Sequence, residues 1–304
     1  MITYLHIGYP KTGTTWFQKN FFPEVENFSL VNREDIVDNL VHCDALNFDP
    51  TKVRGFMNSK YSSNRILSLE GFLGTTHNFG LNGYLSKEHA NRLKEVFPDA
   101  TIILFIRKQH DIISSFYYQY ITGGGTYSIN KYLNNKYFRG LNGLPLFSYR
   151  FFEYDKILDY YNNLFPNGKV DVFLYEEFRE NPKLFLKNFC KKYIFNVDLE
   201  KIDYSYQKQR LRKGLKNLYR FANLFTSRKM LNKYYLINLP YWYDIYKPFF
   251  RDLNEKKIFG NRPNSWQILG KKNYTFISNY YKETNNRLIK EFNLQGIRKY
   301  DYPI

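Results

Sequence analysis

The chain has 304 residues, a net charge of +17, 29 tyrosines and 28 phenylalanines. This length is enough for one α/β domain with a full core, and two cysteines are too few for a disulfide framework. No apolar run approaches the roughly 18 residues of a membrane span, and the start shows no basic leader, so we expect a cytoplasmic protein. The positive charge favours anionic partners such as nucleic acid, acidic lipids, polyanionic glycans or phosphorylated cofactors.

The first two thirds of the chain alternate between strand-like and helix-like patterns. Residues 2–8 form a nearly continuous apolar run that predicts a buried strand, and residues 14–21 predict the first helix. Further strands are expected over 65–72, 100–107 and 169–178, and further helices over 86–98, 111–121 and 181–193. This alternation predicts an α/β fold with a mostly parallel sheet, of the P-loop type, covered by helices on both faces.

Four chemistry-bearing residues fall at or near the carboxyl ends of the predicted strands. They are Gly8, Glu70, Arg107 and Tyr175. In parallel sheets, ligands bind at this edge. The sequence therefore predicts that these residues share one site.

The last third of the chain differs in composition. Residues 204–243 hold nine lysines and arginines and no acidic residue, interleaved with aromatics. The segment 215–225 is helical and amphipathic in pattern, and a final helix is expected over about 273–293. We expect a single domain over 1–304, with a core (1–203), a basic, aromatic helical elaboration (204–272) and a C-terminal helix and tail (273–304).

The segment HIGYPKTGTTWFQ (6–18) resembles a phosphate-binding loop with a displaced lysine. Gly8, Gly13 and Thr15 match the glycines and the final Ser/Thr of the pattern G-x-x-x-x-G-K-[ST]. Thr14 stands where that pattern has lysine, and the loop's own lysine is Lys11. In triphosphate enzymes the lysine reaches the β- and γ-phosphates, so its displacement favours a smaller anion beside a negatively charged leaving group.

The loop carries enough donors to wrap one phosphate. Its main-chain N–H groups are joined by three hydroxyls, from Thr12, Thr14 and Thr15, and Lys11 adds a point charge. At the end of the next central strand, Arg107 can bind a phosphate through two N–H groups, helped by Ser114 or Ser115 on the following helix.

These motifs resemble those of sulfotransferases that use 3′-phosphoadenosine 5′-phosphosulfate. YPKTGTTW (9–16) resembles the family's 5′-phosphosulfate loop, and FIRKQHDIISSFYYQY (105–120) resembles its 3′-phosphate segment. FLYEEFRENPKLFLKNF (173–189) and NYYKETNNRLIKEFN (279–293) are similar to later blocks of bacterial members. The resemblance spans most of the chain, in the correct order.

The resemblance implies a role for each matching residue. The 5′-phosphosulfate would be held by Lys11, Thr12, Gly13, Thr14 and Thr15, with Lys11 stabilising the bridging oxygen as the S–O bond breaks. Trp16 would pack on the adenine and Tyr175 would lie at its edge, while Arg107 and Ser115 would hold the 3′-phosphate. The product would be adenosine 3′,5′-bisphosphate, and no metal would be required, because fixed donors stabilise the leaving phosphate.

A group must also accept the acceptor's proton. Cytosolic family members use a histidine from a K-T-H run at the end of the strand before the 3′-phosphate strand, where this chain has Ser68-Leu69-Glu70. Glu70 is therefore the candidate base, with His77 as the alternative, whereas His6 is expected to be packed within its strand. No His/Cys/Asp cluster in the sequence suggests a metal site.

The family also carries an R-K-G run that touches the 3′-phosphate. Arg212-Lys213-Gly214 matches it but lacks the Gly-Asp-Trp-Lys that follows in the family. A basic helix is the first interpretation of this run, and a cofactor clamp is the second.

The sequence thus predicts a sulfotransferase that acts on a hydroxyl or amino acceptor, with a carbohydrate or glycolipid favoured. The alternatives are a P-loop kinase, which would need the missing lysine, and a nucleic-acid- or polyanion-binding protein, which would use the basic, aromatic 204–243 stretch. That stretch is also compatible with an enzyme that touches an anionic membrane surface or lines an acceptor groove.

Overall fold

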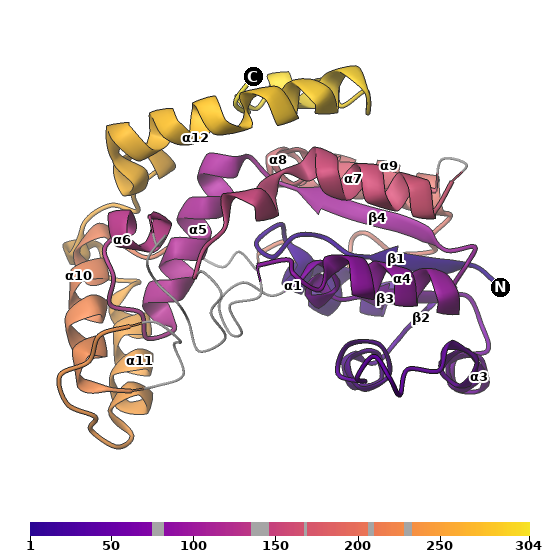
Figure 1. Ribbon diagram of the computed structural model, residues 1–304, viewed down its shortest axis with the longest axis horizontal. Coiled ribbons are helices and arrows are strands. Elements are labelled where there is room, and N and C mark those ends of the chain that lie inside the picture. Colours follow the sequence, from indigo (N-terminus) through magenta and orange to yellow (C-terminus); the bar gives the residue numbers. More distant parts are fainter. Residues whose placement is uncertain (75–81, 135–145, 167–168, 206–209, 228–232) are drawn as a thin grey trace.

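The computed structural model describes residues 1–74, 82–134, 146–166, 169–205, 210–227 and 233–304. Within these residues, five strands form one parallel sheet in the order β2-β3-β1-β4-β5 (Figure 1). The strands are β1 (Thr3–His6), β2 (Ser29–Leu30), β3 (Arg65–Ser68), β4 (Thr101–Ile106) and β5 (Val170–Leu174). The predicted α/β fold is confirmed.

Alternation along the central strands supplies two apolar layers, one on each face of the sheet. Leu5, Leu67 and Leu104 belong to the core shared with α4 (Ser86–Val96), α5 (Gln109–Thr122), α7 (Tyr154–Leu164) and α12 (Ser265–Lys290). Tyr4, Ile66 and Ile103 belong to a second, aromatic core shared with the first helical segment and α9 (Pro182–Tyr193). The strands are buried on both faces because helices cover both sides, as the near-continuous apolar runs predict.

The other helices connect and extend this framework. They are α1 (Thr14–Trp16), which continues as a π-helix (Phe17–Phe21), α2 (Arg33–Ile36), α3 (Pro50–Lys60), α6 (Ile129–Leu133), α8 (Tyr175–Glu180), α10 (Lys213–Ala222) and α11 (Trp242–Leu253). The backbone of α12 breaks at Gly270, whose φ of 74° is a left-handed conformation that suits glycine.

Two predicted strands end earlier than the sequence pattern indicates. β3 ends at Ser68 and is followed by a 3₁₀ turn over Glu70–Leu73, and β5 ends at Leu174 because Tyr175 begins α8. Both changes occur at the carboxyl edge of the sheet, where the chain turns away from its neighbours. Short apolar runs do not distinguish a strand from the first turn of a helix.

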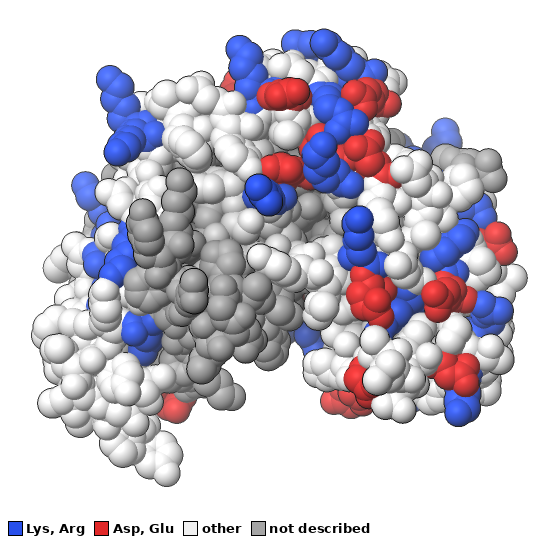
Figure 2. All heavy atoms as spheres, viewed as in Figure 1, with Lys and Arg blue, Asp and Glu red and all other residues white. Residues whose placement is uncertain are grey.

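The helices α10 and α11 lie away from the sheet, at the lower left of Figure 1. In the same view, the surface over the sheet and α7 carries many charged side chains, whereas the lower left is almost entirely white (Figure 2). In the described part of the chain, none of the helices combines the length and the apolar character that crossing a bilayer requires.

Candidate functional site

The loop that follows β1 is fixed to the sheet at its base. The Tyr9 N–H donates to the Phe105 carbonyl over 3.1 Å, and the Thr12 hydroxyl donates to the Tyr9 carbonyl over 2.5 Å. Lys11 and Gly13 both have positive φ values, 74° and 90°, so the backbone reverses tightly between Tyr9 and α1. A non-glycine residue in this conformation stores backbone strain, which is typical of functional loops.

The three loop threonines occupy different environments. Thr12 is fully buried, and its hydroxyl shapes the loop by holding the Tyr9 carbonyl. The Thr14 hydroxyl is also buried, but it has no hydrogen-bond partner within the described residues. Thr15 is half-buried. A buried hydroxyl without a partner costs free energy, and an anion in the loop would supply the missing acceptor.

Arg107 brings the end of β4 against this loop. Its Nη1 donates to the Lys11 carbonyl over 3.0 Å, and its guanidinium carbon lies 4.8 Å from the centroid of the Tyr175 ring. The Tyr175 ring also covers Gly13, since a Cβ built on Gly13 would lie 3.3 Å from it. The Arg107 Nε is buried and has no partner among the described atoms. Lys11, Gly13, Arg107 and Tyr175 are therefore brought together.

A buried carboxylate supports the turn that carries Arg107. Glu176 accepts hydrogen bonds from the Lys108 N–H over 3.0 Å and from the Tyr302 hydroxyl over 2.9 Å. Burial raises the pKa of Glu176, although these donors and the Arg107 charge oppose the rise. The Tyr154 hydroxyl donates to the Arg107 carbonyl over 2.6 Å, so three chain segments hold this turn.

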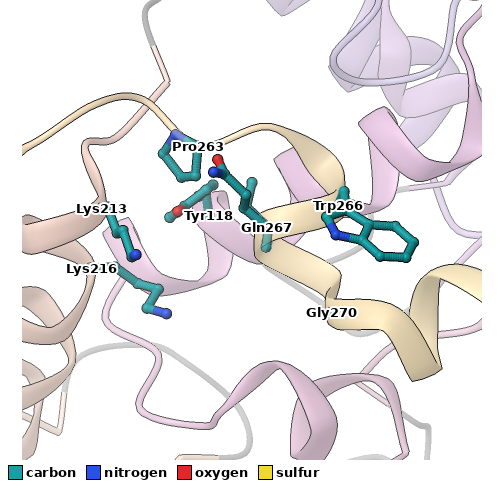
Figure 3. A pocket seen from close by; sticks show the side chains of 8 residues that line it. Tyr118, Lys213, Lys216, Pro263, Trp266, Gln267 and Gly270 are labelled. Atoms are coloured by element: carbon teal, nitrogen blue, oxygen red, sulfur yellow. The ribbon is translucent and has the colours of Figure 1, made fainter.

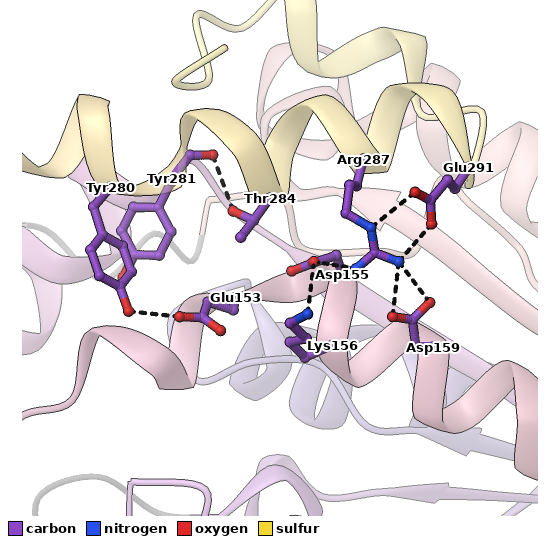
Figure 4. Close-up of polar contacts among 9 residues, drawn as sticks. All are labelled: Glu153, Asp155, Lys156, Asp159, Tyr280, Tyr281, Thr284, Arg287 and Glu291. Atoms are coloured by element: carbon purple, nitrogen blue, oxygen red, sulfur yellow. Dashed lines mark hydrogen bonds and ion pairs between the residues drawn. The ribbon is translucent and has the colours of Figure 1, made fainter.

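The C-terminal tail reaches the turn that carries Arg107 because α12 is anchored on α7 (Figure 4). Arg287 pairs with the buried Asp155 at 2.6 Å and with Asp159 at 3.1 Å, and it also contacts Glu291. Further along, the Asn285 amide donates to the Pro303 carbonyl over 2.8 Å. These contacts make the tail part of the framework behind the loop.

Glu70 lies directly after β3, next to the strand that leads into the loop. The Gln18 amide nitrogen lies 3.4 Å from the Glu70 carboxylate and 2.9 Å from the Ser68 carbonyl. Glu70 is half-buried, so part of its surface is open to solvent. Its contact with the helical segment after the loop runs through Gln18, a residue that the sequence analysis missed.

His6, His89 and His110 are buried, whereas His42 is exposed. Burial lowers the pKa of His6 to about 3, so His6 is neutral, and its Nδ1 lies 2.7 Å from the Ser68 hydroxyl. The expectation that His6 is packed within its strand is confirmed. His110 contacts the Tyr274 carbonyl and the Ser278 hydroxyl on α12. His77, the alternative base, lies outside the described residues.

Trp16 is buried in the aromatic core. Its ring centroid lies 4.9 Å from that of Phe178 and 6.3 Å from that of Tyr204, and its Nε1 donates to the Asp203 carbonyl over 3.2 Å. The indole is 6% exposed, so stacking on an adenine would require the Tyr204 segment to move. The adenine role of Trp16 stays a prediction.

Ser115 lies on the face of α5 that also carries Asp111 and Tyr118, by its spacing of four and three residues. Asp111 contacts Arg210 at 3.6 Å. Burial acts to raise the pKa of Asp111, but the positive charges of Arg107 and Arg210 outweigh it and lower that pKa. Arg210 is thus a second cation near the Arg107 end of α5, and its signal in the sequence was the basic run that begins there.

The R-K-G run divides into two roles. Arg212 is buried, and its side chain donates to the main-chain carbonyls of Asn254, at 2.7 Å, and Gly260, at 2.8 Å. It therefore fixes the backbone before α10. Lys213 begins α10, as the basic-helix interpretation predicts.

A cavity of about 300 Å³ lies beside α10. Lys213 and Lys216 reach into it from α10, Tyr118 forms its α5 side, and Trp266 and Gln267 come from α12 (Figure 3). Burial and the neighbouring cations Arg220 and Lys213 lower the pKa of Lys216. The cavity thus continues the Ser115 face of α5 and carries two positive charges.

No protein-family model matches the sequence, and no curated protein matches it. Solved structures that are similar to the chain include three sulfotransferases. A sulfotransferase from Alicyclobacillus acidocaldarius is 18% identical with a TM-score of 0.49, over 69% of this chain and 87% of its own. The sulfotransferase domain from the curacin biosynthetic pathway is 12% identical with a TM-score of 0.38, over 68% and 78%. Mouse sulfotransferase SULT7A1 complexed with PAP is 11% identical with a TM-score of 0.34, over 96% and 88%.

Proposed function

We propose that this chain is a sulfotransferase that takes its sulfuryl group from 3′-phosphoadenosine 5′-phosphosulfate and passes it to a hydroxyl or amino acceptor. The observation that carries the proposal is the cluster of Lys11, Thr14, Arg107 and Tyr175 around the loop after β1. Two of its polar atoms, the Thr14 hydroxyl and the Arg107 Nε, are buried without a partner in the described structure. Such donors fit a phosphate-bearing ligand.

The donor nucleotide supplies an activated sulfuryl group. The loop N–H groups and the Thr14 and Thr15 hydroxyls would bind its 5′-phosphate, and Lys11 would neutralise negative charge on the oxygen released when the S–O bond breaks. Thr12 would act indirectly, because its hydroxyl already holds the Tyr9 carbonyl. Gly13 is needed where the backbone turns beneath Tyr175.

Glu70 would take the proton from the acceptor. It lies at the carboxyl edge of the sheet, half-buried, and Gln18 contacts its carboxylate. Gln18 would act as a positioning residue, because it ties Glu70 to the helical segment that follows the loop. A carboxylate held in this way would take the proton from one direction. This would favour one orientation of the acceptor substrate.

The 3′-phosphate would be bound along α5. Arg107 and Ser115 supply a guanidinium and a hydroxyl, and Lys213 and Lys216 extend the positive charge into the cavity beside α10. The clamp interpretation of the R-K-G run thus applies to Lys213, since Arg212 is engaged with main-chain carbonyls. As acceptor we propose a carbohydrate or glycolipid.

Calorimetric titration tests the proposal directly. Adenosine 3′,5′-bisphosphate should bind with micromolar affinity without magnesium, and ATP with magnesium should bind weakly. The variants Lys213→Ala and Lys216→Ala should weaken bisphosphate binding, whereas the exposed Lys19→Ala should not. Preference for ATP with magnesium would overturn the proposal in favour of a kinase. Binding of the bisphosphate would justify a screen of sugar and glycolipid acceptors.

A further inference from the structure

One lobe of the molecule holds an unusual concentration of exposed apolar side chains. We define the α10–α11 lobe as α10, α11 and residues 223–227 and 233–241 between them. Its exposed apolar and aromatic side chains are Leu218, Phe221, Tyr234, Tyr235, Leu236, Ile237, Leu239, Tyr241, Ile245 and Phe249. Their exposed fractions run from 41% for Leu218 to 81% for Tyr241. Apolar side chains gathered in this way mark an interaction surface.

Hydrogen bonds hold the main chain of the lobe in place beneath these exposed side chains. The Leu236 N–H donates to the Leu224 carbonyl over 2.7 Å, and the Leu239 N–H donates to the Phe225 carbonyl over 3.0 Å. At the base, the Trp242 indole donates to the Ala222 carbonyl over 3.0 Å, and the Tyr243 hydroxyl donates to the Thr122 carbonyl over 2.9 Å. The main chain is therefore fixed to α10 and α5 while the apolar side chains point outward.

The exposed residues of α11 follow a helical repeat. Tyr241, Ile245 and Phe249 are spaced by four residues and form one stripe, whereas Tyr243 and Tyr246 are buried against the molecule. The helix is therefore apolar on two sides, one packed inside and one open. A helix that only had to pack against the core would need the inner side alone.

The described residues of the lobe carry a net positive charge. Their cations are Lys213, Lys216, Arg220, Lys233, Lys247 and Arg251, against two acidic residues, Asp244 and Asp252. On α11, the exposed Lys247 and Arg251 adjoin the stripe, while Asp244 and Asp252 are the acidic residues of that helix. Cations around exposed aromatic and aliphatic side chains match the surface of an anionic bilayer, where the charges meet acidic headgroups and the apolar groups enter the interface.

We propose that the α10–α11 lobe binds the surface of an anionic lipid bilayer, with Leu236, Ile245 and Phe249 entering the headgroup region. This surface is separate from the loop and Arg107. Lipid binding therefore needs neither the donor nor sulfation, and it can succeed or fail independently of the proposed function.

Vesicle co-sedimentation tests the proposal with the full chain. Vesicles of phosphatidylcholine with about 30 mol% phosphatidylglycerol should bind the chain at least about tenfold more tightly than pure phosphatidylcholine vesicles. The triple variant Leu236→Ser/Ile245→Ser/Phe249→Ser should lose about tenfold in affinity for the anionic vesicles. The matched control, Leu46→Ser/Leu184→Ser/Phe276→Ser, removes exposed apolar side chains from other helices and loops and should bind like the unchanged chain.

Four results would overturn the proposal. The unchanged chain would fail to bind the anionic vesicles, or the lobe variant would bind them as well as the control does. A dimer in size-exclusion chromatography that the lobe variant dissociates, with no lipid binding, would assign the surface to a second copy of the chain. Duplex DNA bound by the control but not by the lobe variant, again without lipid binding, would assign it to nucleic acid. Far-UV circular dichroism of each variant reports whether its fold is intact.

Discussion

Arg107 and Lys11 are joined across the sheet edge, because the Nη1 of Arg107 donates a hydrogen bond to the Lys11 carbonyl over 3.0 Å. The bond links the end of β4 to the turn after β1, two segments that lie far apart in the sequence. It directs the Arg107 side chain toward the loop and leaves the charged end of Lys11 unaffected, since it uses that residue's main chain. The two cations can therefore be tested separately.

Lys11→Ala should lower the sulfation rate about 10²- to 10³-fold, because the charge on the leaving oxygen would lose its stabilising cation. The fold should be unchanged, since alanine keeps the Cβ that lysine already places in the strained φ of 74°. Steady-state kinetics with the sulfate donor would measure kcat, with Lys19→Ala as the exposed control on the same segment. An unchanged kcat would remove Lys11 from the reaction.

Arg107→Ala should weaken bisphosphate binding by about 10- to 100-fold, because a charge-assisted contact to phosphate would be lost. Arg107→Lys should recover little of this affinity, since an ammonium group cannot replace both the Lys11 carbonyl contact and the contact over the Tyr175 ring. Calorimetry on both variants, with the exposed Arg33→Ala as control, gives the dissociation constants. Normal affinity in Arg107→Ala would exclude it from the donor site.

Glu70→Gln should reduce kcat by about 10²-fold or more while leaving bisphosphate affinity unchanged, because it removes the base and keeps the shape. Gln18→Leu should give a smaller loss of kcat, since Glu70 would keep its charge but lose its contact at 3.4 Å. Full activity in Glu70→Gln would clear Glu70 of this role.

The free energy of unfolding should fall between pH 7.5 and 5.5. Burial lowers the pKa of His6 to about 3 and that of His110 to about 4, so both stay neutral in the folded chain. The unfolded chain takes up protons at these histidines below about pH 6.5, so it gains stability relative to the folded chain as the pH falls. Each histidine should contribute about 1.4 kcal/mol over this range. Urea unfolding of His6→Gln and of the unchanged chain at both pH values measures how the free energy of unfolding changes with pH. This change should be smaller for His6→Gln, and an equal change in the two proteins would contradict the assignment.

Arg287→Leu should lower the free energy of unfolding by about 1 to 3 kcal/mol, because the buried Asp155 carboxylate would keep only Lys156, at 3.9 Å, as a neighbouring cation. Arg287→Leu combined with Asp155→Leu should be less damaging than the single change, since no charge is then stranded. Urea unfolding of the single and double variants measures both values. A single variant as stable as the unchanged chain would show that the contacts of Figure 4 contribute little.

The sequence was a good guide to the sheet and to the loop. Apolar runs located β1, β3 and β4, which are buried on both faces, and also the half-buried edge strand β5. The short β2 was missed, since two half-buried residues carry no periodic signal. The helix α7 was missed as well, although its residues include the Tyr154 and Asp155 that support the site.

Contacts between distant segments could not be predicted from local patterns. Glu176 and Tyr302 are joined by a hydrogen bond, and Gln18 meets Glu70, yet neither pair has a spacing that a motif records. The R-K-G run shows the same limit, because its local sequence does not reveal that Arg212 is enclosed by the carbonyls of Asn254 and Gly260. The sequence indicates which side chains could bind a ligand or take part in a reaction. Packing decides which of them are already used in contacts within the protein.

Under the proposed function, the buried donors of Thr14 and Arg107 would link folding to the concentration of the donor nucleotide. An anion that satisfies them binds the folded chain and has no equivalent site in the unfolded one, so it draws the population toward the folded state. At a ligand concentration of about 100 times Kd, this linkage amounts to about 2.7 kcal/mol, a large fraction of a typical domain's stability. If the proposed donor binds there, the lifetime of this protein against proteolysis should rise and fall with the supply of that nucleotide.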